Sequence, residues 1–150
     1  MKNSDVIEVL NDLITKNYDA EEGYKETAEE CDDANLKAFL LRQSKMRYDF
    51  GHELKDEVRR LGGEVEKGTS FAADMHRTWI NLKSAFTSND KEAMLEEAER
   101  GEENALKHYD EAIEKLSAYN QAFNTVSSQR AKIATALADI RTRHSMVAEV

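Results

Sequence analysis

The stretch Met46-Arg47-Tyr48-Asp49-Phe50-Gly51-His52-Glu53-Leu54 lies in the middle of a long amphipathic segment. Across residues 36–61, apolar side chains recur at steps of three and four, a spacing that predicts one buried face of an α-helix. Arg47 falls on that apolar face, whereas Asp49 and His52 fall off it and are expected to face solvent. The stretch therefore predicts a long helix that turns a guanidinium toward the core.

The same spacing predicts further helices on both sides. The sequence lacks proline and is 34% charged, a composition typical of long helices. Capping residues and glycines place the boundaries of the long helices at about residues 4–31, 33–61, 91–116 and 120–147, with a loop at 61–70 and a short helix at 71–87. The apolar face of the last helix is predicted to run through Val126, Arg130 and Ile133.

The lengths of the connections predict the topology. Because residues 31–35 leave room only for a tight turn, the first two helices should form an antiparallel hairpin. If residues 61–87 carry the chain back along the bundle, the last two long helices form a second hairpin. We therefore expect residues 1–150 to be a single all-α domain, a ferritin-like bundle of four long helices. Its two antiparallel hairpins are joined by a crossover that contains the short fifth helix.

The charge of the chain excludes several classes of partner. A net charge of -9 disfavours nucleic acid and anionic membrane surfaces, because the field of the protein repels phosphates. The single cysteine, Cys31, cannot form an internal disulfide, and the first residues do not resemble a signal peptide. No run approaches the roughly 20 apolar residues of a membrane span. We expect a cytoplasmic protein that binds neither nucleic acid nor membranes.

Several runs occur in an order that resembles a known family. They are Leu10-Asn11-Asp12-Leu13-Ile14, Glu21-Glu22-Gly23-Tyr24, Glu57-Val58-Arg59-Arg60-Leu61-Gly62-Gly63-Glu64, His76-Arg77-Thr78-Trp79-Ile80-Asn81-Leu82-Lys83-Ser84-Ala85, Glu99-Arg100-Gly101-Glu102-Glu103 and Ala105-Leu106-Lys107-His108-Tyr109. Between about residues 5 and 115, the chain resembles an uncharacterised bacterial family of ferritin-like helical bundles, catalogued as a domain of unknown function. The resemblance implies a fold and carries no established activity.

The ligand set of ferritin-like enzymes is incomplete in this sequence. Those enzymes resemble one another through a glutamate from each of two helices and a Glu-x-x-His pair from each of the other two. The nearest match is Asp49-x-x-His52, and Arg141 stands three residues before His144. We therefore favour no metal site and no other cofactor. If iron, manganese or zinc is bound, the candidate ligands are Glu21, Glu99, Glu102 and His76.

Polar residues nevertheless fall on the predicted buried faces near the middle of their helices. They are Asn17, Glu21, Gln43, Arg47 and Glu102, with Tyr24 or Tyr109 as a further hydrogen-bond partner. A guanidinium between two carboxylates forms charge-assisted hydrogen bonds, so Glu21, Arg47 and Glu102 are predicted to form a buried ion network in place of a di-metal centre. Alternatively, both glutamates flank the core and reach water. Mid-helix glycines at Gly23, Gly51 and Gly101 indicate close helix approach or room for a neighbouring side chain.

Two classes of function remain open at this stage. The favoured hypothesis is a non-enzymatic bundle without catalytic residues, which acts through self-association or partner binding. It would be a dimer or larger homo-oligomer that uses apolar residues of the short and C-terminal helices. The alternative is a metal-binding ferritin-like protein for iron, manganese or zinc, or a di-metal oxidoreductase. The incomplete ligand set favours the first hypothesis.

Overall fold

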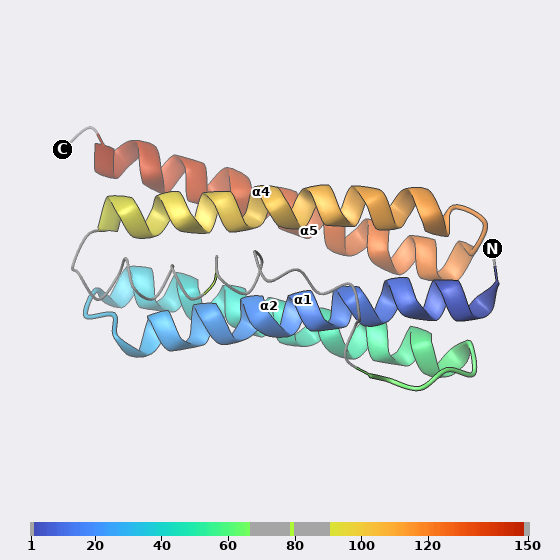
Figure 1. Ribbon diagram of the computed structural model, residues 1–150. Helices are drawn as coiled ribbons and strands as arrows, with labels where there is room; N and C mark the ends of the chain where they lie inside the picture. The colour runs from blue at the N-terminus through green and yellow to red at the C-terminus, as the bar shows by residue number, and fades with distance from the viewer. Residues whose placement is uncertain (1, 67–78, 80–90, 149–150) are drawn as a thin grey trace.

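The described part of the chain is entirely helical outside its turns. The computed structural model describes residues 2–66, 79 and 91–148, and in them the chain forms helices without strands (Figure 1). The helices are α1 (Asn3–Glu29), α2 (Ala34–Arg60), α4 (Lys91–Leu116) and α5 (Asn120–Ala148). The predicted all-α class and the four long helices are confirmed, with boundaries within a few residues. The predicted short helix at 71–87 lies outside the described residues, apart from Trp79.

Local interactions fix the ends of α2. The Asp33 side chain accepts a hydrogen bond from the Leu36 backbone amide at 3.0 Å, and this contact caps the first turn. At the other end, Gly62 adopts φ +80°, and the Gly63 amide donates to the Val58 carbonyl at 3.0 Å. A glycine in the left-handed region satisfies carbonyls that the last helical turn leaves free. The predicted stop at the glycine pair therefore has a structural cause.

The four helices form two stacked antiparallel hairpins. Helices α1 and α2 make one layer, and α4 and α5 make the other (Figure 1). Short connections, residues 30–33 and 117–119, join the helices within each layer. Consecutive helices with such connections must run antiparallel. In residues 2–66, 79 and 91–148, none of the helices has an apolar stretch that would span a bilayer.

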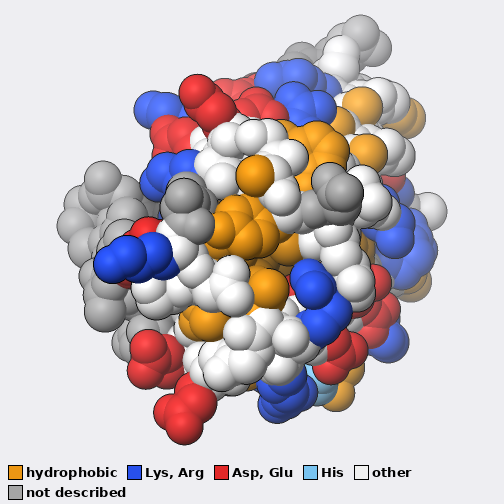
Figure 2. All heavy atoms as spheres, turned by 90° about the vertical axis from the view of Figure 1, so that its right-hand side faces the viewer, with side chains coloured by type: hydrophobic (Ala, Val, Ile, Leu, Met, Phe, Trp, Pro, Cys, Tyr) orange, Lys and Arg blue, Asp and Glu red, His pale blue; other side chains and the backbone are white. Residues whose placement is uncertain are grey.

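The hydrophobic core has two parts, one toward each end of the bundle. One cluster includes Leu10, Phe50, Leu54, Leu116 and Val126, and the other includes Tyr24, Phe39, Leu40, Met94 and Ile140. Figure 2 looks at the bundle from the end that carries the N-terminus, and shows hydrophobic side chains at the centre with charged side chains around them. Along each of α1, α2 and α4, the buried side chains between the two clusters are polar, and they include Asn17, Arg47 and Glu102. The candidate site is built around these three residues.

Trp79 packs against α1, where Gly23 makes room for it. Its side chain is 2% exposed, and its ring centroid lies 5.0 Å from that of Tyr24. A Cβ atom at Gly23 would lie only 2.8 Å from the Trp79 Cβ. The prediction that a mid-helix glycine makes room for a neighbouring side chain is therefore correct for Gly23. At Gly51, in contrast, no described atom lies within 4 Å of an added Cβ, so close helix approach is wrong there.

Candidate functional site

The centre of the site is an ion pair between α2 and α4. The Arg47 Nη2 atom lies 2.7 Å from the Glu102 Oε1 atom, and the two side chains are 1% and 0% exposed. The Arg47 Nη1 atom donates a second hydrogen bond, at 2.9 Å, to the Asn17 Oδ1 atom of α1. Charge-assisted hydrogen bonds of this kind are short and strong. They fix the guanidinium between three helices.

Two tyrosines and a glutamine extend the pair into a layer that involves all four described helices. The Tyr24 hydroxyl donates to the Glu102 Oε1 atom at 3.1 Å. The Asn17 Nδ2 atom donates to the Tyr109 hydroxyl at 2.8 Å, and that hydroxyl donates to the Gln129 Oε1 atom at 2.7 Å. Gln129 in turn donates to the Phe50 carbonyl at 3.2 Å. We call Asn17, Tyr24, Arg47, Glu102, Tyr109 and Gln129 the central polar layer.

Burial and charge set the protonation states of the layer. Burial lowers the pKa of Arg47, but the Glu102 carboxylate and the two tyrosines more than offset this effect, so the pKa is raised and the guanidinium stays charged. Burial also raises the pKa of Tyr24 and of Tyr109, which keeps both phenols protonated at neutral pH. Both hydroxyls can therefore act as hydrogen-bond donors. The Arg47 charge is balanced by one carboxylate, that of Glu102.

The structure joins three of the five predicted network residues, Asn17, Arg47 and Glu102. Glu21 requires a correction, because its side chain is partly exposed and lines a cavity on the α1–α2 surface with His52. The position expected for Glu21 beside the ion pair is taken by Tyr24, one turn further along α1. Gln43 is buried at 9% exposure, but its Oε1 atom has no hydrogen-bond partner among the described residues.

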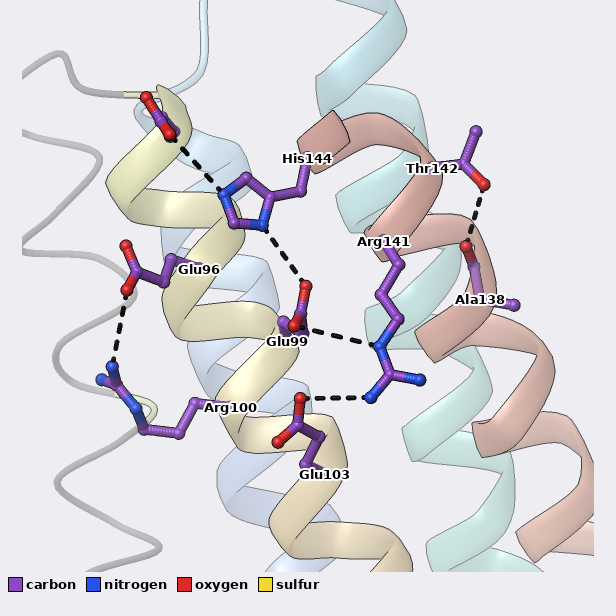
Figure 3. A network of polar contacts seen from close by, with 9 residues as sticks. Glu96, Glu99, Arg100, Glu103, Ala138, Arg141, Thr142 and His144 are labelled. Carbon is purple, nitrogen blue, oxygen red and sulfur yellow. Dashed lines mark hydrogen bonds and ion pairs between the residues drawn. The ribbon is translucent and has the colours of Figure 1, made fainter. Parts of the chain in front are cut away.

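The candidate metal ligands are not gathered at the centre. Glu99 lies on the α4–α5 surface, where its carboxylate meets His144 Nδ1 at 3.3 Å and Arg141 Nε at 3.9 Å (Figure 3). His76 lies outside the described residues. Within residues 2–66, 79 and 91–148, no three histidine, cysteine or acidic side chains are grouped so that they could hold a metal ion. Asp49 and His52, which were predicted to face solvent, both lie at the surface.

Gln129 is the member of the layer that the sequence analysis missed. The predicted inward residue, Arg130, instead reaches the surface and pairs with Asp110 at 2.8 Å. Val126 and Ile133, which were also predicted to point inward, are buried, and Gln129 lies between them in the buried row Ala122, Val126, Gln129, Ile133, Ala136 and Ile140. These residues are spaced by alternating steps of four and three. That regular spacing was the signal available in the sequence.

Comparison with known proteins identifies the family of this chain. A search of curated proteins finds no match. A family model does match residues 5–115, which cover most of the chain. The match includes all of α2, nearly all of α1 and α4, and every residue of the central polar layer except Gln129. The matching family is described as a domain of unknown function, DUF2383, and the chain belongs to it.

Proposed function

We propose that this protein is a ferritin-like bundle that acts by association, with itself or with another protein, and not by catalysis. In this proposal the Arg47–Glu102 ion pair stands where ferritin-like enzymes hold two metal ions. The observation that supports it most directly is the burial of the Arg47 guanidinium, 1% exposed, against a single carboxylate. The two antiparallel hairpins support the ferritin-like architecture, because such bundles join two hairpins through one long crossover.

The charge of the central polar layer argues against a di-metal centre at this place. Two divalent cations in a ferritin-like site are held by four carboxylates and two imidazoles. The described layer contains one carboxylate, Glu102, and its charge is already balanced by Arg47. A guanidinium fixed at the same height of the bundle would repel incoming cations. The arrangement is suited to holding the helices in register.

Metal analysis tests the non-catalytic part of the proposal. The purified protein would be incubated with ferrous iron, manganese or zinc and desalted, and its metal content would be measured together with the rate of ferrous iron oxidation. We expect substoichiometric metal and no acceleration of oxidation. Two retained ions per chain, or catalysed oxidation, would overturn the proposal in favour of a metal-handling protein.

A mass measurement tests the association part. Light scattering coupled to gel filtration should give a molar mass above that of one chain, and the mass should fall on dilution if the assembly is reversible. If the protein is monomeric at every concentration measured and binds no specific protein partner, the association part of the proposal is wrong. The metal result would still stand.

A further inference from the structure

The outward side of α2 carries an exposed ridge of mixed character. Leu41, Lys45, Tyr48 and His52 follow one another at steps of four, three and four residues, which places them in one row on a helix. Leu41 is 45% exposed and Tyr48 is 46% exposed. The Tyr48 ring lies 4.4 Å from the His52 ring, and the Lys45 Nζ atom lies 5.4 Å from the Tyr48 centroid. We call these four residues the α2 ridge.

A groove runs along each side of the α2 ridge. On the α1 side, a cavity of about 770 Å³ is lined by Ile14, Tyr18, Tyr48 and Gly51, among others. On the α5 side, a hollow of about 520 Å³ is lined by residues that include Met46 and Lys132. A ridge between two grooves is the surface shape with which helices pack against one another. A second helix could therefore be seated on α2.

Gly51 keeps the groove on the α1 side open. A glycine inside a helix costs about 1 kcal/mol relative to alanine, so it usually has a packing reason. Here no described atom lies within 4 Å of the position where a Cβ would stand. The fold of the single chain therefore gains nothing from this glycine in the described residues. Space for a side chain of another molecule would explain it.

The charges along α2 are arranged so that the face complements itself. From Ala34 to Tyr48 the helix contains basic residues and no acidic one. Arg42 and Lys45 lie before the midpoint of the face, near residue 47, and Asp49 and Glu53 lie after it at similar distances. A two-fold axis through this midpoint, perpendicular to the helix, would place Arg42 and Lys45 of one copy opposite the part of the other copy that holds Asp49 and Glu53. Oppositely charged residues would therefore meet near the axis, and the basic residues Lys55, Arg59 and Arg60 lie further from it.

We propose that the outward face of α2 docks onto α2 of a second copy of this chain. The two helices run antiparallel, and the α2 ridge of each copy enters a groove beside α2 of the other, with Tyr48 close to the two-fold axis. Lys45 of each copy then faces Asp49 of the other. This inference rests on the proposed function and gives it a partner and a surface. It differs from the sequence-based expectation, which assigned association to the short and C-terminal helices.

Filling the groove should block association without harming the fold. Gly51→Gln introduces a better helix former whose side chain occupies the groove, whereas the matched control Gly51→Ala adds one methyl group to open space. We expect the glutamine variant to dimerise at least about tenfold more weakly, which corresponds to about 1.4 kcal/mol, with the alanine variant unchanged. Circular dichroism melting should show both variants folded. A glutamine variant that dimerises like the parent protein would overturn the proposal.

A charge exchange tests the antiparallel register. Lys45→Glu places a carboxylate opposite Asp49 of the second copy, and Asp49→Lys places an ammonium opposite Lys45, so each variant alone should be monomeric. Mixed in equal amounts, the two variants should form a heterodimer, because every facing pair is then oppositely charged. Lys107→Glu, an equal charge change on the exposed side of α4, is the control and should leave the mass unaffected.

The outcomes separate this inference from the proposed function. If the parent protein is oligomeric and all the α2 variants keep its mass, association stands and the α2 surface is wrong. The same holds if the two charge variants fail to recover a dimer when they are mixed. If the parent protein is a monomer, the self-association that this inference requires is itself absent.

Discussion

Two arginine–glutamate contacts in this molecule have similar chemistry and opposite surroundings. At the centre, Arg47 meets Glu102 at 2.7 Å with both side chains almost fully buried. On the α4–α5 surface, Arg141 meets Glu103 at 3.2 Å with side chains 54% and 48% exposed (Figure 3). Water and salt screen the surface contact, and each surface charge is solvated without its partner. The buried charges have no such alternative, so each depends on the other.

The comparison shows which polar contacts in a bundle determine its structure. A surface pair adds little to the free energy of unfolding and tolerates change. A buried pair also adds little net stability compared with an apolar core, because desolvation opposes the attraction. What the buried pair adds is a strong penalty for any arrangement that separates its members. We therefore propose that the central polar layer fixes the register of the two hairpins.

The largest expected effect comes from removing the buried cation. Arg47→Met leaves the Glu102 carboxylate buried without its counter-charge, which should lower the free energy of unfolding by about 3–5 kcal/mol. Urea denaturation followed by circular dichroism measures this change. An unchanged or higher midpoint would show that Glu102 does not need Arg47, and the proposed role of the pair would be wrong.

The second largest effect is expected to be a recovery of stability when both buried charges are removed. Arg47→Met combined with Glu102→Leu removes both charges, and apolar replacements of a buried pair are often neutral or stabilising. We expect the double variant to regain most of the stability lost in Arg47→Met. A stable double variant can still differ in structure. Altered association or a second folded form would then show that the two hairpins no longer pack in a single register. A double variant as unstable as the single variant would show that Arg47→Met destabilises the protein through lost packing and not through the unpaired carboxylate.

A much smaller effect is expected on the surface. Arg141→Ala should change the free energy of unfolding by less than about 1 kcal/mol, because exposed ion pairs contribute little. Repeating both denaturations in high salt separates the two regions, since screening acts on the exposed pair. The Arg141→Ala difference should disappear in salt, whereas the Arg47→Met difference should persist. If salt reduced the effects of both substitutions on the free energy of unfolding equally, the buried and exposed pairs would not differ in screening as proposed.

The smallest expected effect is the pH dependence due to His108 of α4, which is half-buried beside α1. Burial and nearby Lys16 lower the pKa of His108. The unfolded chain therefore takes up its proton first, and stability should fall as the pH drops below about 6.5, the ordinary histidine value. His108→Gln should flatten this part of the stability profile, and His52→Gln, at the exposed surface, serves as the control. An identical slope in the His108 variant would contradict the assignment.

The sequence predicted the helices well, because a 3.6-residue period over about 27 residues is hard to mistake. The same period predicted that Arg47 points inward. It did not separate Glu21 from Tyr24, because Glu21 borders the predicted face of α1 that carries Tyr24, and the choice depends on where α4 approaches. For α5, Val126 and Ile133 were predicted correctly, but Gln129 and Arg130 each lie three and four residues from them, so the helical period could not choose between the two. Contacts between distant helices, and not local pattern, decide such cases.

The burial of Trp79 has an experimental consequence. It is the single tryptophan of the chain, and its ring packs on Tyr24, whose hydroxyl reaches the central ion pair. Its fluorescence therefore comes from one known place, whereas ellipticity is dominated by the four described helices. If the emission maximum shifts before the ellipticity falls during a denaturant titration, the crossover indole leaves α1 as a separate step. Coincident curves would show that seating the indole and assembling the bundle are a single event.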